Sequence, residues 1–183
     1  MTLTPEQARR AHDEADCLFT REQVEAAFDK MAAEITASLA DKNPLVLCVL
    51  TGAIVPTGIL LPRLDFPLEL DYVHASRYRG ETSGGKLHWI AHPSTPMKGR
   101  TVLVIDDILD EGLTLEAILE ACRNEGASEV YSAVLVDKLH ERKADLKADF
   151  VGLEVEDRYL FGYGMDYEDY LRNAPGIFAV KGM

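Results

Sequence analysis

A cluster of acidic residues lies in the middle of the chain. Asp106 and Asp107 directly follow the apolar run 101–105, and Asp110 and Glu111 come shortly after. Carboxylates this close repel one another unless a cation or hydrogen-bond donors offset their charge. Mg²⁺, which prefers oxygen ligands, or the hydroxyl groups of a sugar would provide that offset. The cluster therefore indicates a site for a metal ion or for a ligand rich in hydroxyl groups.

The residues that follow these acids can bind an anion. Gly112 allows a tight turn, and from Leu113 onward apolar residues recur at three- and four-residue steps, which is typical of a helix. A helix that starts here offers free backbone N–H groups, together with the hydroxyl of Thr114, to a phosphate group. Acids and helix start together fit a phosphorylated sugar. On residue types alone, a solvated acidic loop in front of a capped helix is the alternative.

Buried strands and intervening helices must position this segment. The apolar runs 45–50, 101–105 and 130–136 each predict a strand buried on both faces, and helical patterns lie between them. This alternation predicts an α/β fold with a mainly parallel sheet and helices on both faces. Because parallel strands end at one edge of the sheet, the acidic cluster, the loop 51–52 and Lys138 should converge there.

Further elements are predicted around this frame. Thr4 and Thr20 should cap two N-terminal helices, which end near residues 15 and 40, and a short helix should follow from 54 to 61. Additional strands are indicated at 68–75, 87–90, 148–153 and 176–180. The loop 76–86 is polar and rich in glycine, which favours a lid over a simple turn.

The composition excludes several classes of protein. With 183 residues the chain suits one domain, and its net charge of −12 argues against nucleic-acid binding, which depends on clustered Lys and Arg. The most apolar stretch, 45–61, is interrupted by glycine and proline, so we expect no membrane span. The three cysteines form no CxxC pair and no signal peptide is visible, which favours a cytoplasmic protein with reduced thiols.

The segment 102–114 resembles the phosphoribosyl-pyrophosphate signature of type I phosphoribosyltransferases. That signature is a hydrophobic strand, two acids, two aliphatic residues, an acid, any residue, Gly, any residue and Thr. The segments 149–152 and 162–167, with Arg172 downstream, resemble the purine-binding part of the hypoxanthine-guanine branch. The resemblance runs from about Leu45 to Val180. It implies one phosphoribosyltransferase domain, 1–183, with a lid hairpin and a hood built from about 150–183, to which N-terminal residues can add.

The resemblance also implies an activity. Enzymes of this branch serve purine salvage: with Mg²⁺ they transfer the 5-phosphoribosyl group from phosphoribosyl pyrophosphate to hypoxanthine or guanine. The products are IMP or GMP and pyrophosphate. We therefore expect a cytoplasmic enzyme that forms a homodimer or homotetramer and does not bind nucleic acid or membranes. Glycosyl transfer of this kind separates charge at the sugar, which is why a metal ion is expected.

Each site residue receives a role from the same resemblance. Asp110 would be the general acid/base at N7 of the purine, and Asp107 and Asp166 would hold Mg²⁺. The phosphoribosyl group would be bound by Asp106, Asp107, Asp110, Glu111, Gly112, Leu113 and Thr114. Pyrophosphate would be bound by Thr51, Gly52, Arg77 and Arg172, and the purine by Lys138, Tyr159, Leu160 and Asp166. The lid would include Ser76, Arg77 and Tyr78.

Two departures from the family pattern accompany these assignments. The lid usually carries a Ser-Tyr pair, and here Arg77 precedes Tyr78; the pyrophosphate loop often has a basic residue where this chain has Thr51. Arg77 near the diphosphate could offset the cation missing at position 51. Alternatives within the fold are a xanthine-preferring enzyme and an RNA-binding regulator. A phospho-acceptor signalling domain also pairs two acids with a distant Lys, but its acid pair would be expected near the chain start.

Overall fold

The computed structural model describes residues 3–77, 87–141 and 145–182. In chain order its elements are α1 (Pro5–Glu14), β1 (Asp16–Thr20), α2 (Arg21–Leu39), β2 (Leu45–Leu50), α3 (Ile54–Leu60), the 3₁₀ helix η1 (Leu61–Arg63), β3 (Glu69–Arg77), β4 (Leu87–Ala91), β5 (Thr101–Leu109), α4 (Leu113–Asn124), β6 (Glu129–Leu139), β7 (Phe150–Glu156), β8 (Leu160–Phe161) and β9 (Gly176–Ala179). Most of these elements match the sequence prediction closely; β1 and β8 were not predicted.

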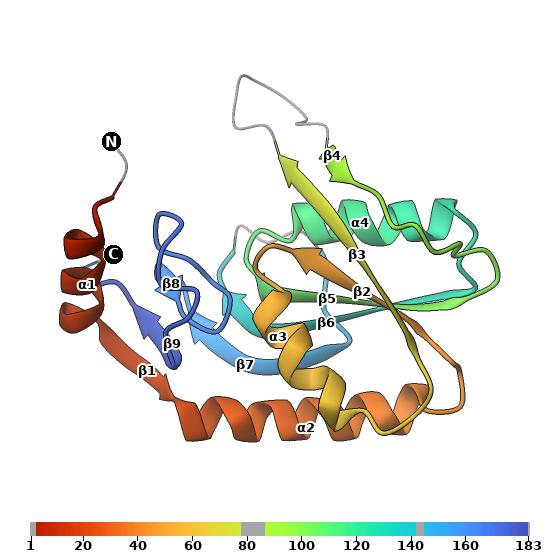
Figure 1. Cartoon of the computed structure of the whole chain (residues 1–183), viewed down its shortest axis with the longest axis horizontal. Helices are drawn as coiled ribbons and strands as arrows, with labels where there is room; N and C mark the ends of the chain where they lie inside the picture. Colours follow the sequence, from red (N-terminus) through yellow and green to blue (C-terminus); the bar gives the residue numbers. More distant parts are fainter. Residues whose placement is uncertain (1–2, 78–86, 142–144, 183) are drawn as a thin grey trace.

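The main sheet has six strands in the order β4-β3-β2-β5-β6-β7 (Figure 1). Its strands pair in parallel except at the edge, where β4 runs antiparallel to β3. The predicted α/β fold with a mainly parallel sheet is therefore confirmed. β2, β5 and β6 lie in the middle of the sheet, so the loops at their carboxyl ends meet at one edge.

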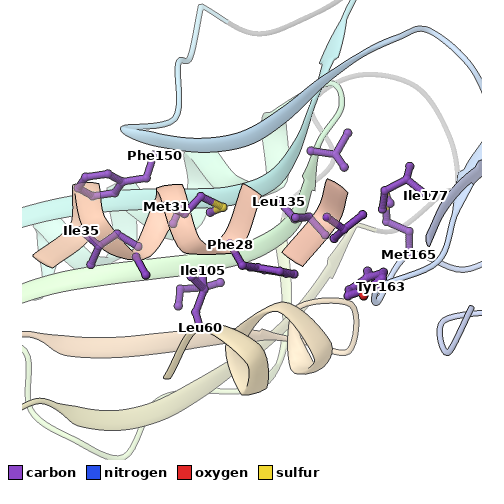
Figure 2. Packing of buried hydrophobic residues seen from close by; sticks show 14 of the residues in the cluster. Phe28, Met31, Ile35, Leu60, Ile105, Leu135, Phe150, Tyr163, Met165 and Ile177 are labelled. Atoms are coloured by element: carbon purple, nitrogen blue, oxygen red, sulfur yellow. The ribbon is translucent and has the colours of Figure 1, made fainter. Parts of the chain in front are cut away.

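Helices cover both faces of this sheet. Along β5, Leu103 and Ile105 pack into the core shared with α2 and α3, whereas Val102 and Val104 pack into the core shared with α4. This alternation is the reason why a strand between two helical layers is apolar at every position. Figure 2 shows Phe28 of α2 in the first of these cores. The capping box that Thr20 forms with Gln23 fixes the start of α2.

A second, three-stranded sheet has the order β1-β9-β8. It joins the two ends of the sequence, because Asp16 of β1 pairs with Ala179 of β9, and Leu160 of β8 pairs with the same residue. In Figure 1 this sheet lies beside the carboxyl-terminal end of β7, next to α1. The element β7 itself belongs to the main sheet.

β5 and β6, which carry predicted site residues, continue further than the sequence predicts. β5 extends to Leu109, so Asp106 and Asp107 lie within the strand and not in a loop after it. β6 extends to Leu139 and includes Lys138. The reason is continued backbone pairing between these neighbours, for example of Asp106 with Val134. Backbone hydrogen bonds thus extend the strands through polar positions that the hydrophobic pattern assigns to loops.

The described part of the chain contains no helix that is long and apolar enough to cross a membrane. Cys48 and Cys122 are buried free thiols, and Cys17 is exposed. Burial raises the pKa of the Cys122 thiol to about 11. A thiol with such a pKa is almost entirely protonated at neutral pH and therefore a poor nucleophile.

Candidate active site

The acid pair Asp106 and Asp107 lies near the carboxyl end of β5. Both residues are half-buried, and the backbone N–H of Asp107 donates to Oδ1 of Asp106 over 2.9 Å. Burial and the adjacent charge of Asp107 raise the pKa of Asp106 well above its ordinary value. Burial also raises the pKa of Asp107, although the nearby Arg172 guanidinium acts in the opposite direction. The pair is therefore a concentration of unfavourable negative charge, which a cation or hydroxyl donors would stabilise.

The loop after β2 packs directly on this pair. Gly52 lies so close to Asp107 that a Cβ atom at position 52 would overlap the Asp107 carboxylate. Thr51, joined to Leu50 by a cis peptide bond, is exposed beside it. The structure thus brings Gly52 to the acidic cluster, as the fold prediction required.

The start of α4 borders the same region. Gly112 has a left-handed conformation with φ of 81°, which glycine adopts without steric cost, and it occupies the N-cap position. Its carbonyl accepts the hydrogen bond from Glu116 N–H, and no side chain caps the helix among the described residues. The N–H groups of residues 113–115 precede this first helical bond and suit an anion.

A second group of charged residues surrounds Asp110. Lys138 Nζ lies 3.0 Å from Asp110 Oδ2 and 3.0 Å from Asp157 Oδ1, and its side chain is only 10% exposed. His140 Nε2 lies 2.6 Å from Asp110 Oδ1. One nearly buried ammonium group therefore bridges two carboxylates that are each partly open to solvent. The two carboxylates exceed the single ammonium by one negative charge, and their partly exposed oxygens can meet a polar ligand.

The segment between β8 and β9 closes on the loop 51–52. A Cβ atom at Gly164 would overlap the carbonyl oxygen of Gly52, so the two backbones are in contact. Arg172 donates to the Gly164 carbonyl over 2.6 Å and forms an ion pair of 2.8 Å with Asp166. Asp166 also accepts from Asp169 N–H over 2.9 Å. Arg172 thus stabilises the segment between β8 and β9 through bonds to two other residues of the same segment.

The residues predicted from the sequence form two groups in the structure, one around Asp107 and one around Asp110. Gly52 contacts Asp107, while Lys138 contacts Asp110 in the same strand-end region. Tyr159 is 41% exposed, and its ring meets the edge of Tyr167 at 5.4 Å between centroids. Leu160 is buried in β8. Its segment reaches the Lys138 group through Asp157.

The predicted lid falls mostly outside the described residues. Ser76 and Arg77 complete β3, and Tyr78 and the rest of 78–86 are not described. Upstream in β3, His74 pairs with Leu50, directly before the loop 51–52. The base of the predicted lid therefore lies next to that loop.

Two residues of the site were missed by sequence reasoning. His140 and Asp157 both contact the Lys138–Asp110 pair. The spacing of His140, two residues after Lys138 and directly after β6, was an available signal, because alternate residues of an extended chain point the same way. The sequence around Asp157 contains no pattern that would indicate a place in the site. Its contact depends on how the chain after β7 folds back.

The donor set can be tested for a metal ion. Asp106 and Asp107 fit a divalent cation, because their oxygens are close and burial disfavours two uncompensated charges. Asp166 fits less well, since Arg172 already offsets its charge at 2.8 Å. A cation would therefore be held first by the β5 pair.

Comparison with known proteins identifies the family. The family described as phosphoribosyl transferase domain matches residues 15–168. The chain belongs to this family. It is 39% identical over 171 residues to the hypoxanthine-guanine phosphoribosyltransferase of Bacillus subtilis, which covers 93% of this chain and 95% of that protein. It is also 39% identical over 165 residues to the hypoxanthine-guanine-xanthine phosphoribosyltransferase of Tritrichomonas foetus, covering 90% of each.

Solved structures agree with this assignment. A hypoxanthine phosphoribosyltransferase from Staphylococcus aureus superimposes with a TM-score of 0.88 at 30% identity, over 93% of this chain and 94% of that one. The family predicted from the motif at 102–114 is therefore confirmed, and so is the type I phosphoribosyltransferase fold.

Proposed function

We propose that this phosphoribosyltransferase transfers the 5-phosphoribosyl group from phosphoribosyl pyrophosphate to hypoxanthine or guanine, in purine salvage. One observation carries the proposal: the acid pair and the start of α4 lie at the same sheet edge as the Asp110–Lys138 pair. We call the first group the sugar-phosphate half of the site and the second group the purine half. The names of the related enzymes support the same substrates. The products are IMP or GMP and pyrophosphate.

The sugar-phosphate half would bind phosphoribosyl pyrophosphate. Asp106 and Asp107 would accept hydrogen bonds from the two ribose hydroxyls. The 5′-phosphate would lie at the start of α4, against the N–H groups of 111–114 and the Thr114 hydroxyl. Helix N-termini bind phosphate because their N–H groups and dipole favour negative charge.

Mg²⁺ is the divalent ion that we propose for this site. Asp107, with Asp106 beside it, would hold the ion, and Asp166 would add a ligand if its ion pair with Arg172 opened. Bound Mg²⁺ supplies positive charge to the departing pyrophosphate. Removal of divalent ions with a chelator should abolish transfer, and Mg²⁺ should restore it.

The purine half would choose and activate the base. Lys138 would donate to the 6-oxo group, which favours hypoxanthine and guanine over adenine. Asp110 would accept the N7 proton, and one acid or base positioned in this way contributes about 10²–10⁴ in rate. Tyr159 would stack on the base, and the backbone of Leu160, with Asp166 nearby, would meet its edge. The exposure of the Tyr159 ring, 41%, is compatible with stacking.

The pyrophosphate would lie between the loop 51–52 and Arg172, under the lid of Ser76, Arg77 and Tyr78. We propose that Arg77 supplies the cation that Thr51 lacks. If so, Arg77→Ala should raise the KM for phosphoribosyl pyrophosphate about tenfold. An unchanged KM would refute this role.

Release of pyrophosphate tests the proposed function. The purified protein, phosphoribosyl pyrophosphate and Mg²⁺ are mixed with hypoxanthine, guanine, xanthine or adenine in parallel. We expect turnover with hypoxanthine and guanine and none with adenine, whose 6-amino group cannot accept from Lys138. A clear preference for xanthine would identify the second candidate function, that of a xanthine-preferring enzyme. The name of the Tritrichomonas foetus relative, which includes xanthine, favours this candidate. Absence of turnover with every base would refute the function.

We further propose that residues 1–183 act as one domain, with the β1-β9-β8 sheet as the hood, in a cytoplasmic homodimer or homotetramer. Leu70, Tyr72 and Ile90 of β3 and β4 are each at least half exposed, although large and apolar. Large exposed apolar side chains on two adjacent strands mark a candidate contact surface between copies of the chain. Light scattering of the wild type and of Tyr72→Glu tests this assembly, because the variant should shift toward monomer.

A further inference from the structure

Both carboxylate oxygens of Asp110 are occupied by side chains from one short segment. Lys138 Nζ lies 3.0 Å from Oδ2, and His140 Nε2 lies 2.6 Å from Oδ1. Only 5% of the His140 side chain is exposed, compared with 45% for Asp110. A short contact between imidazole and carboxylate is typical of a strong, charge-assisted hydrogen bond. The buried histidine therefore restricts a carboxylate that is otherwise open to solvent.

Lys138 and His140 differ in their freedom to leave Asp110. The Lys138 ammonium has a second carboxylate partner, Asp157, at 3.0 Å, and it has three protons to distribute. When it donates to a 6-oxo group, its contact with Asp110 Oδ2 is weakened. His140 has a shorter and more rigid side chain, and its contact is with the other oxygen. It can therefore hold Asp110 while Lys138 moves.

A metal ion is the competing interpretation of this cluster. Asp110, His140 and Asp157 place ligand atoms within 4.8 Å of one another. However, the Lys138 ammonium lies 3.0 Å from both carboxylates and already supplies positive charge between them. A metal ion would have to displace it. The hydrogen-bonded arrangement is the one that the four side chains satisfy together.

We propose that His140 is a positioning residue for the proton transfer, an inference that rests on the proposed function. In the reaction, the N9 electron pair forms the bond to C1′. The C1′–O bond breaks with its electrons on pyrophosphate, and the N7 proton passes to Asp110 Oδ2. Throughout, Oδ1 accepts from the protonated Nε2 of His140, so the carboxylate keeps the orientation that presents Oδ2 to N7.

Three variants test this role: His140→Leu removes the hydrogen bond, His140→Gln restores a donor without the ring, and His92→Leu is a matched control on the surface. Each is assayed with hypoxanthine and with 8-azahypoxanthine, whose extra ring nitrogen makes the N–H proton more acidic. Thermal unfolding and the KM for phosphoribosyl pyrophosphate are measured alongside. A general effect on folding would change these last two quantities.

For His140→Leu we expect a roughly tenfold lower kcat with hypoxanthine and a KM for phosphoribosyl pyrophosphate within about twofold of wild type, because only the proton acceptor is misplaced. With 8-azahypoxanthine the loss should fall to about threefold or less, since the proton leaves more easily. His140→Gln should recover much of the activity, and His92→Leu should match wild type.

Equal losses with both bases, or an unchanged kcat in His140→Leu, would overturn the inference. If His140→Leu does not fold, His140→Gln decides alone, through the ratio of its kcat with hypoxanthine to its kcat with 8-azahypoxanthine. If kcat is reduced but this ratio equals that of wild type, a role in proton transfer is excluded. Inactive wild type would instead refute the proposed function, and with it this inference. The two failures are therefore distinguishable.

Discussion

Gly52 and Asp107 are packed so closely that no side chain fits at position 52. A Cβ atom there would overlap the carboxylate at the end of the short Asp107 side chain. Asp107 lies within β5, where strand pairing limits its ability to shift. The loop after β2 and Asp107 near the end of the central strand are thus fitted to each other, and both border the proposed pyrophosphate and metal sites.

We predict that Gly52→Ala folds but binds phosphoribosyl pyrophosphate poorly. The added methyl group must displace the Asp107 carboxylate, and a displacement of about 1 Å in a site of this kind can cost about 10²-fold in rate. Steady-state kinetics should show a KM for phosphoribosyl pyrophosphate raised at least tenfold. Kinetics like those of wild type would show that the loop adapts.

Gly58 provides the matched control for this substitution. It lies in α3, and a Cβ atom there would meet no other atom within 4 Å. Gly58→Ala should therefore leave the kinetics unchanged and stabilise the protein by about 0.5–1 kcal/mol, because alanine is the better helix former. Urea unfolding measures this difference.

Asp110→Asn should retain the fold and lose most turnover. The amide cannot accept the N7 proton, so kcat should fall by about 10²–10⁴, with a smaller effect on the KM for phosphoribosyl pyrophosphate. Asp157→Asn is the control, since it also removes a carboxylate partner of Lys138 while leaving Asp110 intact. Its kcat should fall less than tenfold. Similar losses in both variants would assign the effect to Lys138.

The sequence predicted the centre of this fold better than its margins. The bounds of β2, Leu45–Leu50, agree with the prediction, because every residue of a strand buried on both faces is apolar and the run is therefore easy to recognise. By contrast, β1 pairs with β9 across almost the whole length of the chain, for example Asp16 with Ala179. No local pattern in 16–20 signals a partner so distant, so this strand could not be predicted.

The same difference applies to the candidate site. Asp106, Asp107 and Asp110 stand in one motif, and their relation to the helix start could be inferred from spacing. His140 and Asp157 belong to the site only because side chains meet in space. Histidine after a strand is unremarkable by itself, and its significance depends on a 2.6 Å contact with Asp110.

The pH dependence of stability should reveal the lowered pKa of Asp71. Burial by itself would raise its pKa, but hydrogen bonds from the N–H groups of Tyr72, Ser94 and Thr95 and from the Ser94 hydroxyl outweigh this and lower the pKa to about 2. A carboxyl group with a lowered pKa stabilises the fold above its unfolded pKa of about 4, and this contribution is lost as the pH falls toward 2.

Asp71→Asn should therefore cost about 2 kcal/mol of unfolding free energy at pH 7. The difference from wild type should narrow as the pH falls from about 4 toward 2, because the wild-type carboxyl group then becomes protonated. Urea unfolding at pH 7, 4 and 3 measures it, with the exposed Asp65→Asn as control. A difference that does not change with pH would contradict the assignment.

Tyr163 connects the carboxyl-terminal segment to α2. Its hydroxyl donates to Glu25 over 3.0 Å, and Glu25 also pairs with Arg63 at 2.6 Å. Burial and this hydrogen bond raise the pKa of Tyr163 to about 12. A raised pKa means that the contribution to stability is complete below the unfolded pKa of about 10 and is lost as the pH rises toward 12.

Tyr163→Phe should cost about 1 kcal/mol at pH 8, the usual net value of one hydrogen bond. The cost should shrink between pH 8 and 10.5, as the hydroxyl of the unfolded wild type begins to ionise. Because Tyr163 lies directly before Gly164, which contacts Gly52, loosening it should also raise the KM for phosphoribosyl pyrophosphate modestly. Urea unfolding at both pH values and steady-state kinetics test the two effects; stability equal to wild type at pH 8 would show that the hydrogen bond contributes nothing.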